Sequence, residues 1–433
     1  MVDAAFPRIF IFLIIFFHFK ILLAQTEFSF PFFSFCPKNG ADFSAGISGD
    51  ASLNSPDLKN NFFYQFNKNG KITEEGKNLI SDKLSTSNRI GADGNYGLFF
   101  SQKLNCRNDS VATESEINSS WNYFIRIADR THFDARFPKD LFDLAFYGNQ
   151  KFKGDTAFLD NTSLNYLRYQ QLQLGIIHSN EKKLSYGISF SLLKGEENYL
   201  AQLNRVRFFT DENGEKIALD FRGEGRYTNP SNKGFGAING WGFSTSLFAG
   251  YPIKLIEHNT LVSVEMNDFG FIRWDNKSNF YKADTTLQFS GINISDIFLL
   301  NDSVLKSISP DSLTENINSL KTNSKYLSYL PAVLKGSWLV DWNKFSFGLG
   351  LAYRIKANYH PYFLLKSGYK ISKIVSLSTL FSEGGYGKFG FGVEAALKLK
   401  KLSLAAGSNN LEGLVFKNIS GGTSGYLSAI INF

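Results

Sequence analysis

The chain has 433 residues, with 46 basic and 39 acidic side chains and a formal net charge of +7 at pH 7. This modest charge, without clusters of Lys and Arg interleaved with aromatic residues, gives no indication of a nucleic-acid partner. Aromatic residues make up 16% of the chain, with 44 Phe and 19 Tyr. Because Phe and Tyr are frequent in strands and at membrane–water boundaries, the composition favours a β protein at a membrane.

The N-terminal residues predict a secretory signal peptide. Ile9–Phe17 is an unbroken apolar run, Arg8 precedes it, and Ala24 offers a small residue before a cleavage site. The run is shorter than the roughly 20 apolar residues of a membrane-spanning helix, although an uncleaved N-terminal anchor is the alternative. We therefore expect removal of residues 1–24, a periplasmic N-terminal segment over residues 25–41, and an outer-membrane domain over residues 42–433.

The rest of the chain shows the alternation of β-strands. In Phe345–Lys356, large apolar side chains occupy every second position, and Ser, Gly, Ala, Arg and Lys lie between them. Leu184–Leu192 and Phe389–Lys398 repeat the pattern. A soluble sandwich also alternates, but its second face meets water, whereas here that face is mainly Gly, Ser and Ala. The pattern is typical of a closed antiparallel transmembrane β-barrel, whose side chains face lipid and lumen in turn.

We expect an all-β barrel of about 14 strands, within a range of about 12 to 16. Short turns alternate with long connections, and the count places every short turn on the side of the C-terminus, as in outer-membrane barrels. The hairpin Leu203–Tyr227 is either an extension of a loop or two further strands. The expected strands are 42–50, 94–104, 119–130, 166–178, 184–194, 240–251, 260–272, 331–341, 345–356, 361–371, 374–382, 388–398, 400–408 and 424–433.

Short helices are predicted in the long connections. Phe137–Gly148 has Pro138 near its start and Gly148 just past its end, the asymmetry that is typical of helix termini. This helix either caps the rim of the barrel or enters the lumen as a plug or gate. A second helical stretch is predicted at about Asp311–Thr322.

The C-terminus predicts a closing strand. Leu427, Ala429, Ile431 and Phe433 share one apolar face, and the last strand must pair with the first because an open edge in lipid is costly. A terminal aromatic such as Phe433 resembles the signal that the barrel-assembly machinery reads. We therefore expect that machinery, outer-membrane lipid and lipopolysaccharide as partners, and the cell outer membrane as the location.

No group of residues in the sequence indicates catalysis, a metal or a cofactor. The five His are scattered, and the HExxH and GxSxG motifs are missing, so we expect no enzymatic activity. Glu265, Arg354 and Glu394 lie on predicted inward faces and are candidate lumen-lining residues. Cys36 and Cys106 both fall on the predicted periplasmic side, and two Cys in an exported chain suggest a disulfide.

Four segments carry a resemblance to known proteins: Phe137–Thr156 (FPKDLFDLAFYGNQKFKGDT), Asp268–Trp274 (DFGFIRW), Tyr329–Trp338 (YLPAVLKGSW) and Gly384–Leu411 (GGYGKFGFGVEAALKLKKLSLAAGSNNL). The chain resembles a family of uncharacterised Bacteroidota outer-membrane barrels from about residue 40 to the C-terminus. Those proteins are similar to the PorP/SprF proteins of type IX secretion and gliding, and more distantly to FadL-like fatty-acid transporters. The resemblance implies the barrel, and its motifs carry no site residues.

Two functions of different classes stay open. The first is passive, porin-like transport of small molecules, hydrophobic ones included, through the lumen. The alternative is a non-conducting scaffold or partner-binding barrel of a secretion or gliding apparatus, whose proteins would then be partners. A continuous path through the lumen would favour transport, and a blocked interior with large ordered loops would favour a scaffold.

Overall fold

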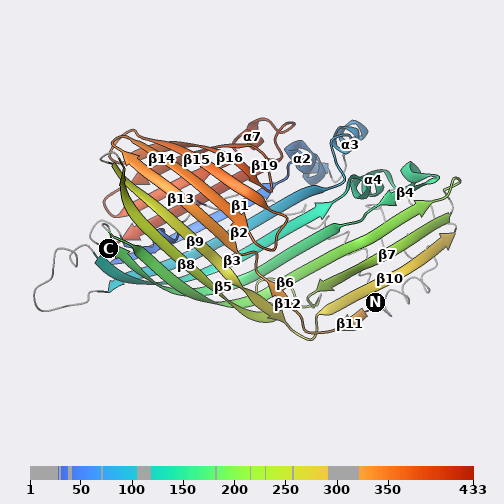
Figure 1. Cartoon of the computed structure of the whole chain (residues 1–433), viewed down its shortest axis with the longest axis horizontal. Helices are drawn as coiled ribbons and strands as arrows, with labels where there is room; N and C mark the ends of the chain where they lie inside the picture. Colours follow the sequence, from blue (N-terminus) through green and yellow to red (C-terminus); the bar gives the residue numbers. More distant parts are fainter. Residues whose placement is uncertain are drawn as a thin grey trace, which may run out of the picture.

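A computed structural model shows the fold of the chain (Figure 1). It describes residues 28, 31–37, 41–69, 72–104, 119–180, 183–214, 216–229, 231–255, 258–290 and 321–433. The predicted signal peptide, Cys106 and most of the second predicted helix lie outside these ranges. No helix in the described ranges is long and apolar enough to cross a membrane.

Fourteen strands form the closed wall of an antiparallel barrel, as the sequence predicts. The last strand pairs with the first from Ser44 opposite Asn432 to Asn54 opposite Gly422, which closes the sheet. In order around the wall, the strands are β1 (Phe43–Asn54), β2 (Asn88–Leu104), β3 (Ser119–Phe137), β5 (Thr162–Asn180), β6 (Ser185–Thr210), β8 (Gly240–Leu255), β9 (His258–Trp274), β13 (Val333–Trp342), β14 (Phe345–Arg354), β15 (His360–Lys370), β16 (Val375–Gly385), β17 (Gly390–Lys398), β18 (Leu402–Ser408) and β19 (Gly422–Asn432).

The two faces of the wall follow the alternation in the sequence. On β14, Phe345 and Leu349 are exposed on the outer face, whereas Ala352 and Arg354 are buried on the inner face. Large apolar side chains on the other strands continue this exposed outer surface. β14 ends at Arg354 rather than at the predicted residue 356, because Lys356 has a left-handed φ of 61° that turns the chain.

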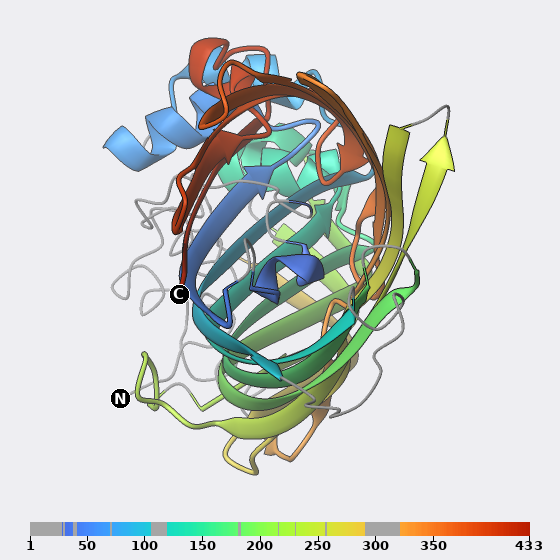
Figure 2. The same ribbon diagram turned by 90° about the vertical axis from the view of Figure 1, so that its left-hand side faces the viewer.

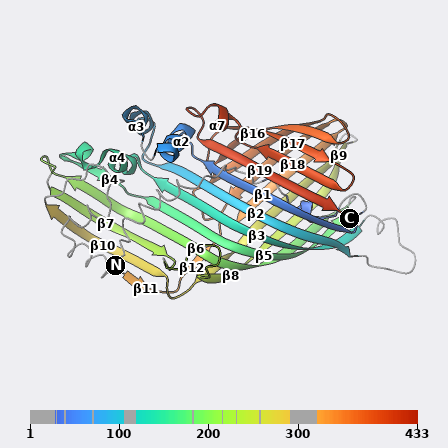
Figure 3. The same ribbon diagram turned by 180° about the vertical axis from the view of Figure 1, so that it is seen from behind.

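Strands on one side run far beyond the rim of the barrel (Figures 1 and 3). β6 pairs with β8 up to Gly195 and with β7 (Lys216–Tyr227) from Tyr199 onward. β7 pairs in turn with β10 (Asn279–Ser290). The hairpin Leu203–Tyr227 is therefore an extension outside the closed wall. Three short strands complete this sheet: β4 (Asp155–Phe158), β11 (Lys321–Asn323) and β12 (Leu327–Tyr329).

We call the end of the barrel that carries this extension the loop end, and the opposite end, where the C-terminus lies, the turn end. Helices α2 (Asn60–Asn69), α3 (Glu74–Ser81) and α4 (Lys139–Tyr147) gather at the loop end, together with η2 (Asn149–Phe152) and α7 (Glu412–Val415). The predicted helix at 137–148 is thus present, and Gly148 ends it with a φ of 74°. α4 lies at the loop end, where its Phe142 packs against Phe62 of α2, and this position favours the predicted cap on the rim over a plug.

Candidate functional site

An N-terminal segment lies inside the barrel (Figure 2). Its short helix η1 (Phe32–Phe35) positions the Phe35 ring against two rings of the wall. The Phe35 ring stacks on the Phe124 ring at a centroid distance of 4.2 Å, and its centroid lies 5.1 Å from that of the Phe99 ring. Phe99 and Phe124 are inward residues of β2 and β3. Residues 31–37 belong to the segment that the sequence places in the periplasm, and in the structure they lie within the lumen.

The same segment also contacts the opposite part of the wall, at β14 and β15. The Phe28 ring stacks with Tyr362 of β15 at a centroid distance of 6.5 Å. Gly350 of β14 makes room for this ring, because a Cβ at Gly350 would lie 2.8 Å from its edge. We call residue 28 and residues 31–37 together the plug, since they contact inward side chains on both sides of the lumen.

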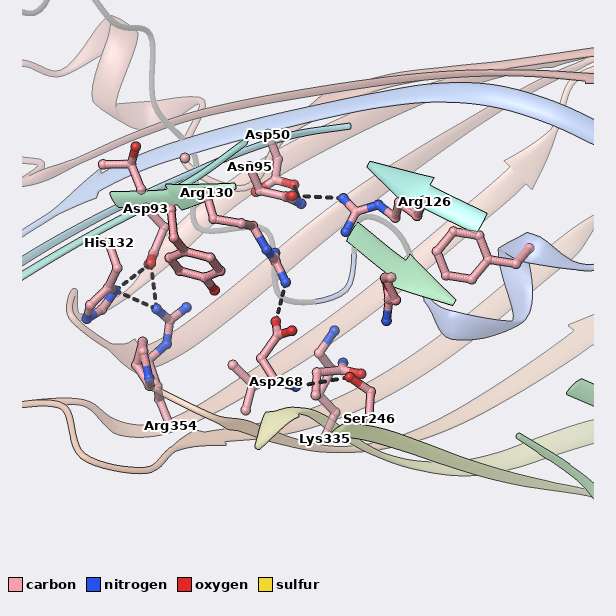
Figure 4. A pocket seen from close by; sticks show the side chains of 18 residues that line it. Asp50, Asp93, Asn95, Arg126, Arg130, His132, Ser246, Asp268, Lys335 and Arg354 are labelled. Atoms are coloured by element: carbon pink, nitrogen blue, oxygen red, sulfur yellow. Dashed lines mark hydrogen bonds and ion pairs between the residues drawn. The ribbon is translucent and has the colours of Figure 1, made fainter. Parts of the chain in front are cut away.

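A cavity of about 140 Å³ lies beside the plug in the middle of the lumen (Figure 4). Strands from around the barrel contribute to it, and its lining is rich in charged side chains. The lining residues are Phe35, Asp50, Asp93, Gly94, Asn95, Arg126, Arg130, Thr131, His132, Tyr169, Gln173, Ser246, Asn267, Asp268, Pro331, Val333, Lys335 and Arg354.

Ion pairs cross this cavity. Arg354 of β14 donates to Asp93 of β2 at 2.5 Å, and Nδ1 of His132 lies 2.7 Å from the same carboxylate. Arg130 of β3 pairs with Asp268 of β9. Such pairs hold opposite parts of the wall together through the lumen, and they make its centre polar. Within the described residues, no group of His, Cys, Asp and Glu is arranged to hold a metal ion.

One comparison with known proteins identifies the family. A model of a family of unknown function, DUF5723, matches residues 40–409. The chain belongs to DUF5723. No curated protein matches it. The Bacteroidota origin and the similarity to PorP/SprF proteins stay predictions for this DUF5723 protein.

Solved structures with a similar outline share little sequence with this DUF5723 protein. They include the Pseudomonas putida toluene transporter TodX, at 10% identity and a TM-score of 0.40 over 92% of this chain and 90% of that one. A Pseudomonas aeruginosa FadL homologue has 10% identity and a TM-score of 0.39 over 91% of each chain. The translocator domain of the autotransporter NalP from Neisseria meningitidis has 8% identity and a TM-score of 0.36 over 91% and 89%. At these scores the similarities do not indicate a substrate.

The predicted lumen residues of this DUF5723 protein fall into two places. Arg354 lines the central cavity, and Glu265 lies buried behind Lys335, 3.6 Å from its amine. Glu394 is elsewhere, where it accepts hydrogen bonds from Lys366 at 2.6 Å and from Tyr426 at 2.8 Å.

Of the remaining predicted site residues, the structure describes Phe433 at the turn end and Cys36 in the plug. The backbone N–H of Phe433 donates to Phe43 of β1, so the terminal residue takes part in barrel closure. Cys36 is buried in the plug next to Phe35. Its predicted disulfide partner, Cys106, lies outside the described residues, and the disulfide stays a prediction.

Most of the charged residues that line the cavity were not predicted from the sequence. Arg126, Arg130 and His132 occupy alternate positions of β3, on the face that also carries Phe124. Arg126 and Arg130, on the inward face of the strand predicted at 119–130, are the signal that could have revealed the charged cavity, whereas His132 lies beyond that predicted strand. Asp268 carried no such signal, because it has a left-handed φ of 60° beside an irregularity in the pairing of β8 with β9.

Proposed function

We propose that this DUF5723 protein is an outer-membrane barrel that carries small polar solutes passively through its lumen, and that the plug closes this path. The apolar outer face of the wall supports the membrane location. Leu349 is 49% exposed in mid-strand, with Leu351 and Phe363 around it on neighbouring outward positions. Such a surface is costly in water and matches the lipid-facing band of an outer-membrane barrel.

The position of the plug inside the lumen is the observation that carries the transport proposal. The plug lies in the lumen by packing of side chains such as Phe28 and Phe35, and within the described ranges it pairs with no strand of the wall. Burial of one Phe side chain contributes about 1.5–3 kcal/mol. Side-chain packing of this kind is easier to release than the ladder of backbone hydrogen bonds between two wall strands, so we propose that movement of the plug opens the lumen while the barrel stays closed.

The charged lining favours polar solutes over hydrophobic ones. Asp93, Arg130, Asp268 and Arg354 meet in the narrow centre of the lumen. A hydrocarbon at this level would displace water from charged groups and give them no hydrogen bonds in return, which is unfavourable. A polar solute can replace those hydrogen bonds.

Conductance of the purified protein in planar lipid bilayers tests the proposal. Gly350→Ser would push against the Phe28 ring and loosen the plug. Gly336→Ser on the neighbouring strand is the control for the substitution itself, because Gly336 lies on the outward face opposite Leu351 and a Cβ there meets nothing within 4 Å. We expect rare openings in the wild type and in Gly336→Ser, and frequent openings in Gly350→Ser. Silence of all three proteins, with normal assembly, would contradict transport.

A scaffold is the second candidate, and the extension at the loop end favours it. β6, β7 and β10 continue the sheet beyond the rim, and α4 packs on it through Leu141 and Leu144. A large ordered surface of this kind suits contacts with other proteins, such as those of a secretion or gliding apparatus. Silent bilayers for all three proteins would favour this candidate.

A further inference from the structure

The central cavity contains one arginine without a carboxylate partner in the described part of the chain. Arg130, Lys335 and Arg354 each form an ion pair. Arg126 instead donates from Nη2 to the neutral amide oxygen of Asn95 at 2.8 Å. Figure 4 shows this guanidinium among the lining side chains, directed toward Asn95.

Arg126 is deeply buried, so its charge matters. The residue is 6% exposed, and its Nε lies against the wall, 3.1 Å from the position that a Cβ of Gly97 would take. Nε has no hydrogen-bond partner among the described residues. Asp50 is connected to Arg126 only through Asn95, whose side-chain amide donates a hydrogen bond to the Asp50 carboxylate at 2.8 Å. A buried cation without a carboxylate in direct contact is costly, and an anion in the cavity would offset that cost.

We infer that this cavity binds a small, singly charged oxyanion, a carboxylate or a phosphate, on Arg126. The inference rests on the proposed function and names its solute class. A guanidinium matches the two oxygens of such a group. The volume of about 140 Å³ admits a few non-hydrogen atoms, since one water occupies roughly 30 Å³.

The other groups in the cavity limit the charge of the ligand. Asp50, Asp93 and Asp268 line the same space and offset much of its positive charge, so a second negative charge on the ligand would find no cation to balance it. The site is therefore suited to a monoanion. Its position also connects it with the plug: Phe35 lines the cavity and stacks on Phe124, two residues before Arg126 on the same face of β3. A bound anion would lie directly against the plug.

Thermal unfolding of the full mature protein in detergent tests the site without any need for transport. The probes are sodium formate and monobasic sodium phosphate, each against sodium chloride at equal ionic strength. The proteins are the wild type, Arg126→Gln, and Arg205→Gln as the matched control. Arg205 pairs with Asp220 and Asp284 on the extension, away from the cavity.

We expect at least one oxyanion to raise the unfolding temperature of the wild type and of Arg205→Gln by about 2 °C or more over chloride. Arg126→Gln should lose this difference, and Arg126→Lys should keep part of it. The Lys variant, which retains the charge, serves if Arg126→Gln does not assemble. A formate effect alone identifies a carboxylate ligand, and a phosphate effect alone identifies a phosphate.

Equal shifts in the wild type and Arg126→Gln, or no shift in any protein, would overturn the inference. Bilayer recordings separate this failure from that of transport. An Arg126-dependent shift in a protein that conducts no ions would overturn transport and leave the anion site standing. Conduction without an Arg126-dependent shift would overturn the anion site and leave transport standing.

Discussion

Arg354 on β14 and Asp93 on β2 form an ion pair of 2.5 Å through the lumen, although 261 residues separate them in the chain. The two strands are not neighbours in the wall. His132 shares the same carboxylate. Because both side chains are held away from bulk water, the charge of each is stabilised mainly by the opposite charge of the other.

Asp93→Asn should therefore destabilise the barrel. The change leaves the buried guanidinium of Arg354 without its carboxylate, and loss of one partner of a buried pair costs about 3–5 kcal/mol. Urea unfolding in detergent, followed by tryptophan fluorescence, measures the effect. The double variant Asp93→Asn with Arg354→Gln should recover much of the loss, because it removes both charges. Equal stability of the wild type and Asp93→Asn would show that water already screens the pair.

Leu349 tests the orientation of the wall in the membrane. Its exposed side chain lies in mid-strand on the outer face of β14, opposite Leu365 of β15. Leu349→Arg should impair assembly, because Arg at the middle of a bilayer costs a barrel roughly 2–4 kcal/mol. Leu349→Cys in isolated outer membranes should react with a lipid-soluble thiol reagent and resist a water-soluble one. Ready labelling by the water-soluble reagent would rule out lipid contact at this position.

The predicted disulfide between Cys36 and Cys106 would tether the plug. Cys36 lies beside Phe35 in the lumen, so a bond from it would hold η1 in place. We expect no free thiol in freshly isolated membranes and a change in gel mobility upon reduction. Reductant should also increase channel opening in bilayers, and Cys36→Ser should open equally often with and without reductant. Rapid labelling of both thiols would refute the bond.

The loop around α7 should become less stable as the pH rises. Burial raises the pKa of Glu412 above its ordinary value of 4.5, against hydrogen bonds from the Phe391 N–H, Asn410 and Ser420. The folded loop thus favours the protonated form, and this contribution is lost as the pH increases through the raised pKa. Hydrogen exchange, corrected for the intrinsic rate at each pH, should show stronger protection of α7 at pH 5 than at pH 7. Glu412→Gln should remove the difference, and an opposite trend in the wild type would contradict the assignment.

The wall could be predicted because alternation is a local property of the sequence. Large apolar residues such as Leu349 mark the outward face of each strand. Closure could be predicted because the alternating C-terminal strand needs the first strand as its partner. The length of β6 was not predictable in this way. It exchanges β8 for β7 beyond Gly195, and partner exchange leaves no periodic signal within the strand itself.

The site was harder to predict because it depends on contacts between distant segments. Nothing periodic marks Phe35 as a residue that stacks on Phe124, and the ion pair between Asp93 and Arg354 requires the curvature of the whole barrel. The inward charges of β3 were visible in the sequence, but their partners were not.

The unequal strands give the barrel a slanted mouth. β6 runs for 26 residues and β18 for 7, so at roughly 3.3 Å per residue the sheet on the side of β6, with its extension, reaches far beyond the rim on the side of β18. A molecule that approaches from the side of the short strands reaches the opening directly, whereas one that approaches from the side of β6 meets the outer surface of the sheet. In the proposed membrane location, neighbouring proteins on the side of the short strands would obstruct this opening more than neighbours on the side of the extension, so the proposed transport would depend on how the protein is rotated within the membrane plane.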